Sequence, residues 1–145
     1  MSNPIFKKVL LAVDNSEQSE RAAQKAIELF QVGQISEIVV FNVYNTSDLD
    51  VTKLSYQEKL DEKRGNSLIT LKQFAEKLDT LNIPNEIKRA GGDPASLILD
   101  LVDNEGDFDL IIMGSRRLNK FQELALGSVT DKVTRLVNLP VLVIK

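Results

Sequence analysis

Short apolar runs alternate with longer amphipathic segments along the whole chain. Lys8 to Val13 (KVLLAV) and Glu37 to Val43 (EIVVFNV) are continuous runs rich in β-branched residues. Such runs are typical of strands buried on both faces. Shorter apolar runs lie at Asp109 to Met113 and Val141 to Lys145, and a weaker strand pattern lies at Asn85 to Ala90. We therefore expect five strands.

The segments between the first three runs carry helix signals. The first predicted helix is capped by Asn15 or Ser16, runs to about Phe30 and stops before Gly33. The second spans roughly Gln57 to Leu81, after a polar loop. Its apolar residues recur at three- and four-residue steps, which favours a core-facing stripe over a groove for a partner. The stripe comprises Leu60, Leu68, Leu71, Phe74, Ala75, Leu78 and Leu81.

Two further helices complete the alternation. The third begins with Asp93 as cap and Pro94 at the first helical position, and it ends near Asn104, before Gly106. The fourth spans Ser128 to about Val137. Strands that alternate with helices in this way indicate an α/β fold, a parallel sheet with helices on both faces.

The composition excludes several kinds of chemistry. The chain has 145 residues, which fits a single domain over 1–145, and it contains 0 Cys and 0 His. It therefore has no disulfide, no thiolate nucleophile, no Cys/His zinc site and no Ser-His-Asp machinery. Acid–base chemistry would need Asp, Glu, Lys, Tyr or a metal-bound water. The lack of cysteine fits a cytoplasmic location.

Charge and hydropathy narrow the set of partners. The formal net charge is −3, which disfavours nucleic acid as the main partner because that affinity depends on neutralising phosphates. No apolar run approaches the roughly 18 residues of a membrane span, so we expect no membrane partner. The apolar run near the N-terminus follows two lysines and meets Asp14, which indicates a first strand and not a signal peptide.

Two strand ends and one helix start are candidates for ligand binding. In parallel α/β sheets, ligands bind beyond the carboxyl ends of the strands, where the strand order reverses. Asp14 ends the first run and Gly114 ends the fourth, and twelve residues separate Gly114 from Gly127. The free N–H groups at a helix start can hold a phosphate, and the hydroxyls of Ser128 and Thr130 could add donors.

A plainer interpretation of the same residues stays open. Ser128-x-x-Asp131 matches a capping box, which any helix can use, and Gly114 could be only a turn after a strand. The length of the connection favours the ligand site, because connections of this kind are usually about 2–6 residues and longer ones are often functional.

The whole chain resembles the universal stress protein family. The resemblance rests on KVLLAVD with SEQSERA, on GGDPASLIL, DLIIMGS and LALGSVTDKV, and on the terminal LPVLVIK. The nucleotide-binding members carry Gly, two residues, Gly, nine residues, and then Gly-Ser or Gly-Thr. Here the pattern reads Gly114, Arg117, nine residues and Gly127-Ser128, so the spacing is kept and arginine replaces the middle glycine.

The resemblance implies a Rossmann-like three-layer sandwich of the adenine nucleotide α-hydrolase type, with strand order 3-2-1-4-5. It also implies one ATP, with or without Mg²⁺, between the first and fourth strands. Asp14 faces the ribose or adenine in this scheme and is the one candidate for a Mg²⁺ ligand, with a plain strand-end cap as its alternative. The positions matching the adenine side are Ala12, Val13, Asp14 and Val43. Those matching the phosphate side are Met113, Gly114, Arg116, Arg117, Gly127, Ser128, Val129 and Thr130.

Arginine at position 117 could either hinder or assist the binding of a phosphate. It would cost about 1 kcal/mol if the backbone there is left-handed, and its side chain could block a phosphate. Alternatively Arg116, Arg117 and Lys120 form a local positive excess, and a guanidinium can hold a phosphate through two hydrogen bonds. A solvated basic loop is the plain alternative for these three side chains.

Two functions follow from the resemblance. The first is an ATP-binding stress-response protein with at most slow ATP hydrolysis. It would form a homodimer through the apolar edge strand Val141–Ile144, unless a loop or helix covers that edge. The second is a dimeric interaction or regulatory member of the same family that binds no nucleotide. An adenylating transferase is disfavoured, because Asp14-Asn15-Ser16-Glu17 lacks the glycine-rich loop that such enzymes carry after the first strand.

Overall fold

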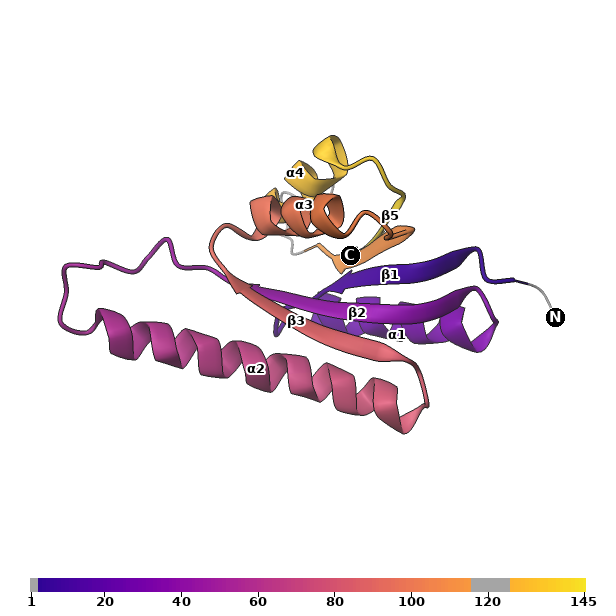
Figure 1. Ribbon diagram of the computed structural model, residues 1–145, viewed down its shortest axis with the longest axis horizontal. Coiled ribbons are helices and arrows are strands. Elements are labelled where there is room, and N and C mark those ends of the chain that lie inside the picture. Colours follow the sequence, from indigo (N-terminus) through magenta and orange to yellow (C-terminus); the bar gives the residue numbers. More distant parts are fainter. Residues whose placement is uncertain (1–2, 116–125) are drawn as a thin grey trace.

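Five parallel strands form one sheet in the order β3-β2-β1-β4-β5. The computed structural model describes residues 3–115 and 126–145. Figure 1 shows the sheet nearly edge-on, with helices on both sides. The fold class and the strand order expected from the sequence are both confirmed. The strands are β1 (Phe6–Ala12), β2 (Ile35–Tyr44), β3 (Asn85–Gly91), β4 (Leu110–Gly114) and β5 (Val141–Ile144).

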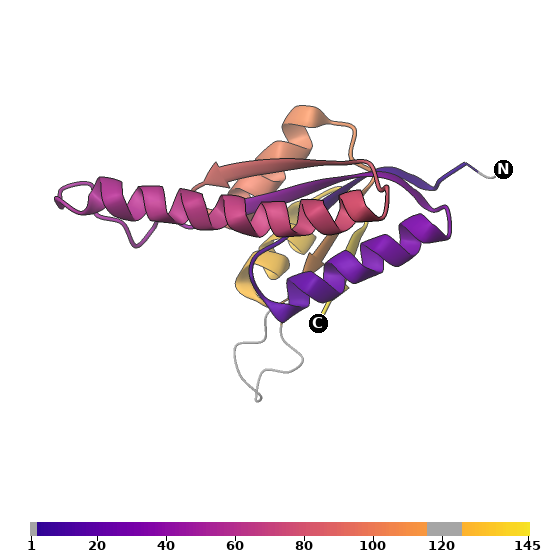
Figure 2. The same ribbon diagram turned by 90° about the horizontal axis from the view of Figure 1, so that it is seen from below.

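The helices divide into two pairs. α1 (Glu17–Gln31) and α2 (Tyr56–Thr80) cover one face of the sheet, and Figure 2 shows both of them from that side. α3 (Pro94–Glu105) and α4 (Ser128–Leu136) cover the other face. The chain thus moves to the opposite face between β3 and β4, which places β1 and β4 at the point where the strand order reverses.

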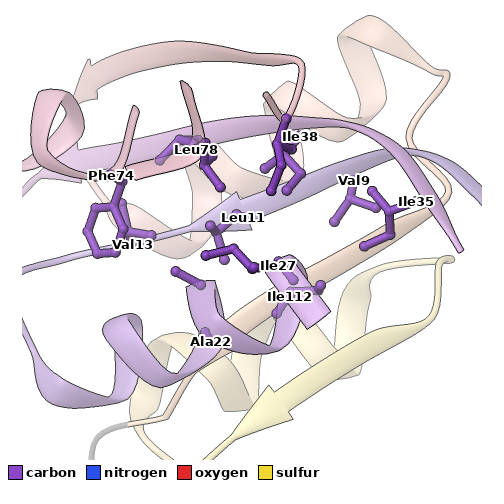
Figure 3. Close-up of a cluster of buried hydrophobic side chains, with 14 of the residues drawn as sticks. Val9, Leu11, Val13, Ala22, Ile27, Ile35, Ile38, Phe74, Leu78 and Ile112 are labelled. Carbon is purple, nitrogen blue, oxygen red and sulfur yellow. The ribbon is translucent and has the colours of Figure 1, made fainter. Parts of the chain in front are cut away.

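β1 is buried from both sides because its alternate side chains enter two different cores. Val9 and Leu11 belong to the core under α1 and α2, whereas Leu10 belongs to the core under α3 and α4. Figure 3 shows the first of these cores, where Ala22 and Ile27 of α1 face the sheet, with Phe74 and Leu78 of α2 nearby. The amphipathic stripe of α2 is therefore a core face, as predicted, except at Leu81, which is 41% exposed.

Local signals set most of the helix ends. Ser16 caps α1 by accepting the N–H of Ser19 at 3.2 Å, and Asp93 caps α3. Gly33 (φ 82°) follows α1, and Gly106 (φ 70°) ends α3; both lie in the left-handed region that favours glycine. These predicted starts and stops are confirmed.

The strand ends differ from prediction where tertiary partners extend them. β2 begins at Ile35, two residues before the predicted start, because Ile35 pairs with Phe6 at the start of β1. β1 begins at Phe6, two residues before its predicted start at Lys8, whose ammonium donates to Glu105 at 2.7 Å and to Asp107 at 3.0 Å. A charged residue can occupy this strand because carboxylates from the end of α3 neutralise it.

Candidate functional site

A cavity of about 250 Å³ lies beyond the carboxyl ends of β1 and β4. Its position is the one that an open α/β sheet offers at the reversal of strand order. Residues from β1, β2 and β4 contribute to its lining, together with the first turns of α1, α3 and α4. The site is thus built from segments far apart in the sequence.

Ten of the twelve residues proposed from the sequence surround this one cavity, and their role in binding remains a prediction. They are Ala12, Val13, Asp14, Val43, Met113, Gly114, Gly127, Ser128, Val129 and Thr130. Arg116 and Arg117, like Lys120, lie outside the described residues. The sequence reasoning missed Ser19, Phe41, Pro94 and Ile98, which also line the cavity. Pro94 could have been anticipated, because the helix that follows β3 starts at the same edge of the sheet.

One end of the cavity has an apolar floor. Phe41 and Val43 of β2 contribute to it from the sheet, and Pro94 and Ile98 contribute from α3. Phe41 and Ile98 are almost fully buried members of the core on this face. A rigid apolar surface of this kind suits a planar, weakly polar group such as a heterocyclic base.

A buried polar pair fixes the tip of β1 beside this floor. The side-chain amide of Asn42 donates to the carbonyl oxygen of Val13 at 2.7 Å, and the Ser67 hydroxyl donates to Asn42 Oδ1 at 2.5 Å. Asn42 and Ser67 are 8% and 4% exposed, so they hold each other in an otherwise apolar core. The Asn42 side chain occupies the position at which a further rung of the β1–β2 ladder would form.

The backbone of Val43 is consequently open towards the cavity. Alternate residues of a strand in a parallel sheet direct their N–H and C=O to opposite neighbours. The carbonyl of Phe41 accepts the N–H of Val13 at 2.9 Å, so Val43, two residues further, also faces the β1 side. Within the described residues neither backbone group of Val43 forms a hydrogen bond there, because β1 has ended. A donor and an acceptor therefore lie side by side at the cavity wall.

Asp14 holds the start of α1. Its Oδ1 accepts the N–H of Ser16 and the hydroxyl of Ser19, both at 2.9 Å. Ser19 Oγ in turn accepts the N–H of Asp14 at 2.8 Å. These bonds agree with the strand-end cap considered for Asp14. Among the described residues, no group of three or more Asp, Glu, His or Cys side chains is placed to hold a metal ion.

Gly114 is required by packing between β4 and α1. A Cβ at this position would lie 2.6 Å from the backbone carbon of Gln18 and 2.8 Å from its carbonyl oxygen. Real Cβ atoms do not approach backbone this closely. The glycine thus lets the first turn of α1 lie directly against the end of β4, so the end of β4 and the start of α1 meet at the cavity.

The start of α4 carries no capping side chain. Its N-cap is Gly127, with φ −61° and ψ 157°, and no side chain makes a cap hydrogen bond there. Ser128 is the first helical residue, so the capping-box alternative for Ser128 and Asp131 is wrong. The first intrahelical bond runs from the N–H of Asp131 to the carbonyl of Gly127, at 2.9 Å. The amides of the three residues in between have no acceptor within the helix, and these residues line the cavity.

Polar contacts hold α4 in this position. The Thr130 hydroxyl donates to the carbonyl of Gly114 at 3.2 Å, so it is used by the protein and does not point to a ligand as proposed from the sequence. Lys132 reaches from α4 to α3, where it lies 3.7 Å from the Asp93 carboxylate. The backbone and side-chain hydrogen bonds from Ser96 hold the pKa of Asp93 below its ordinary value, and Lys132 contributes in the same direction.

No helix in the described part of the chain combines the length and the apolar character needed to cross a bilayer. α2 is the longest of these helices, with 25 residues, and its surface is rich in charged side chains.

Known proteins resemble this chain over almost its entire length. "Universal stress protein YxiE" of Bacillus subtilis is 29% identical over 97% of this chain and 100% of its own. "Universal stress protein MJ0577" of Methanocaldococcus jannaschii is 30% identical, covering 97% of this chain and 96% of its own. The solved structure of MJ0577 superimposes with a TM-score of 0.83, over 97% of this chain and 96% of that one.

Two more distant structures share the fold and are described as nucleotide complexes. One is a universal stress protein in complex with cAMP (22% identity, TM-score 0.71, 97% of this chain and 98% of that one). The other is an Arabidopsis thaliana protein with AMP bound (18% identity, TM-score 0.70, 96% and 91% coverage). The sequence model of the universal stress protein family matches residues 5–145. The chain therefore belongs to the universal stress protein family.

Proposed function

We propose that this protein binds ATP in the cavity between β1 and β4 and acts as a nucleotide-dependent stress-response protein. The observation that carries the proposal is that a single cavity joins an apolar floor to the uncapped start of α4. A nucleotide has this same polarity, an aromatic base at one end and a chain of anionic phosphates at the other.

The base end of the cavity favours adenine. The N–H and C=O of Val43 lie side by side and face the space beyond β1. Adenine presents an acceptor, N1, next to a donor, the N6 amine, and can form one hydrogen bond with each backbone group. The apolar floor around Phe41 and Ile98 supplies the remaining contact with the ring.

The phosphate end relies on backbone amides. The N–H groups at the start of a helix carry partial positive charge, and anions bind there without any basic side chain. Ser128, Val129 and Thr130 supply three such amides at the cavity. The basic side chains Arg116, Arg117 and Lys120 remain predicted additions to this end.

Magnesium fits this site as a companion of the phosphates. Mg²⁺ commonly binds through substrate phosphates and water with only one or two carboxylates. Among the described residues Asp14 is the one carboxylate that lines the cavity, and two donors already occupy its Oδ1. Any hydrolysis is slow in this proposal, since Asp14 is the one candidate for a general base in the part of the lining that the structure describes.

Related proteins support a nucleotide ligand in general. The structures described with cAMP and with AMP share this fold, and both of those ligands are adenine nucleotides. The step from these ligands to ATP rests on the three amides at the start of α4, which have no acceptor within the helix and are proposed to bind its phosphates.

A pair of variants at position 128 tests the proposal. Ser128→Pro removes one amide donor from α4 but suits the first helical position, so the helix should persist. Ser128→Ala removes only the hydroxyl. We expect MgATP affinity, measured by isothermal titration calorimetry, to fall about tenfold in Ser128→Pro, as for loss of one charge-assisted hydrogen bond. Ser128→Ala should bind nearly as well as the wild type.

Nucleotide carried through purification provides a second measurement. Denaturing the purified protein should release adenine nucleotide that absorbance and mass spectrometry detect. A wild-type protein that releases none, and that neither binds nor is stabilised by MgATP, ADP or AMP, would overturn the proposal in favour of an interaction protein without nucleotide.

The proposal also includes a homodimer and a cytoplasmic location. β5 is an edge strand whose four residues, Val141–Ile144, are apolar and half-buried. β3, at the opposite edge, carries Glu86, Lys88 and Arg89, and charged side chains of this kind discourage edge pairing. This contrast favours β5 as the edge that pairs with a second copy.

A further inference from the structure

Ser115 lies just behind the cavity and connects three elements. Its hydroxyl oxygen accepts the N–H of Gly127, the N-cap of α4, at 2.9 Å. Its own N–H donates to the carbonyl of Ile144 in β5 at 2.8 Å. Ser115 is only 2% exposed and is absent from the cavity lining, so it has no direct contact with a molecule bound there.

This contact supplies from a distance what α4 lacks locally. Gly127 has no side chain with which to cap its helix, and the first turn of α4 receives no capping bond from its own side chains. Ser115, twelve residues earlier in the chain, holds Gly127 instead. Because Ser115 is itself bonded to β5, the start of α4 is fixed relative to the sheet.

The arrangement also decides which amides face the cavity. The N–H of Gly127 is used by Ser115, so the amides left for an anion are those of Ser128, Val129 and Thr130. Loss of the Ser115 hydroxyl would leave the Gly127 N–H in a buried place without its acceptor. The first turn of α4 would then shift or rotate to satisfy that amide, and the other three would move with it.

We propose that Ser115 is a positioning residue for the phosphate end of the site, and that it sets the preference of this protein for phosphorylated nucleotides over nucleosides. This inference rests on the proposed ATP site. The base end depends on different contacts, at Val43, Phe41 and Ile98, which lie on β2 and α3. A change at Ser115 therefore acts on phosphate recognition and leaves recognition of the base unchanged.

The test compares ATP with adenosine in Ser115→Ala. We expect ATP affinity, measured by calorimetry, to fall about tenfold while adenosine affinity stays within about twofold of the wild type. Ser67→Ala is the control, because it removes another buried serine hydroxyl whose hydrogen bond runs to Asn42 and not to α4. It should leave the ratio of ATP to adenosine affinity unchanged.

Amide hydrogen exchange gives a readout independent of any ligand. The N–H of Gly127 should be protected in the wild type and should exchange at least about tenfold faster in Ser115→Ala. Ser115→Cys keeps the approximate volume with a weaker acceptor, so it should show the same trend if the alanine variant folds poorly.

Three results would overturn the inference. These are an equal loss of ATP and adenosine affinity, no loss of either, or unchanged exchange at Gly127. Failure of the proposed function is distinguishable, because the wild type itself would then bind neither ligand, and the inference would fall with it.

Discussion

The absence of a Cβ atom at Gly114 allows β4 and α1 to meet at the cavity. Gly114→Ala places a Cβ 2.6 Å from the backbone of Gln18, which cannot move without displacing the first turn of α1. We expect a loss of about 1–3 kcal/mol in the free energy of unfolding, measured by urea denaturation. An unchanged or raised stability would contradict this account of the glycine.

Gly65 provides the matched control. It lies within α2, and a Cβ there would meet nothing within 4 Å. Gly65→Ala should therefore stabilise the protein by about 0.5–1 kcal/mol, because alanine favours a helix more than glycine does. The same substitution is thus expected to have opposite signs at the two positions.

The buried pair Asn42 and Ser67 makes a second prediction at this scale. Ser67→Ala leaves Asn42 Oδ1 buried without its donor and should cost about 1–3 kcal/mol. In the Asn42→Val background the same change removes nothing further and should cost less. A double-mutant cycle by urea denaturation measures the difference, and additive effects would show that the two side chains are not coupled.

The sequence predicts which residues line the cavity better than it predicts the contacts that each of them makes. Gly114 and Thr130 were expected from their place beside a strand end and a helix start, and both line the cavity. Their contacts depend on which helix packs against them. The pattern of residues along the chain does not show which segments lie next to each other in space. Ser115 went unnoticed for the same reason, since its partners Gly127 and Ile144 lie twelve and twenty-nine residues away.

At the scale of elements, hydrophobic periodicity and capping residues were sufficient to predict the succession of strands and helices along the chain. All nine elements were expected near their observed places, because each is bounded by a glycine, a proline or a capping side chain. The misplaced ends occur where partners extend a strand, as Ile35 pairs with Phe6. The capping box of α4 failed because Gly127 precedes Ser128 as N-cap, and a long-range contact made a local cap unnecessary.

An ion-pair cluster joins β1, β3 and α3 at the opposite end of the sheet from the cavity. Glu105 accepts hydrogen bonds from Lys8 and from Lys88, and these hold the pKa of Glu105 below its ordinary value of 4.5. A carboxyl whose pKa is lowered by folding contributes stability above its ordinary pKa. That contribution is lost as the pH falls through the folded-state pKa.

Glu105→Gln tests this cluster. We expect the variant to be less stable than the wild type by about 1 kcal/mol at neutral pH, and the difference to shrink steadily below pH 4.5. Thermal or urea denaturation across that range measures it. Glu62→Gln, at an exposed position on α2, is the control and should change stability little at any pH. A pH-independent difference for Glu105→Gln would contradict the assignment.

At the scale of the whole molecule, strand order determines where the site forms. The alternation of elements predicted a parallel sheet, but order 3-2-1-4-5 came from the resemblance to a family. Alternation alone is compatible with several orders, and Asp14 and Gly114 lie beside each other only in those that make β1 and β4 neighbours. The location of the cavity was therefore predictable once the family was recognised, and its detailed lining was not.

The edge of the sheet determines how two copies would meet. The carbonyls of Pro140 and Ile144 accept the N–H groups of Ile111 and Ser115, so these two residues face the β4 side. Because alternate residues of a strand face opposite sides, Val143 directs its N–H and C=O outward. Proline is tolerated where the N–H of an edge strand faces solvent. Val143→Pro should thus remove a hydrogen bond between copies while leaving the β4–β5 ladder in place.

Light scattering after size exclusion measures the outcome against the chain mass of 16.2 kDa. We expect the wild type at twice that mass and Val143→Pro near the mass of one chain, with an unchanged far-ultraviolet circular dichroism spectrum. Val143→Ala keeps the N–H and should remain paired, because edge pairing depends chiefly on backbone hydrogen bonds. A dimeric proline variant would move the interface away from β5, and a monomeric wild type would remove the homodimer from the proposal.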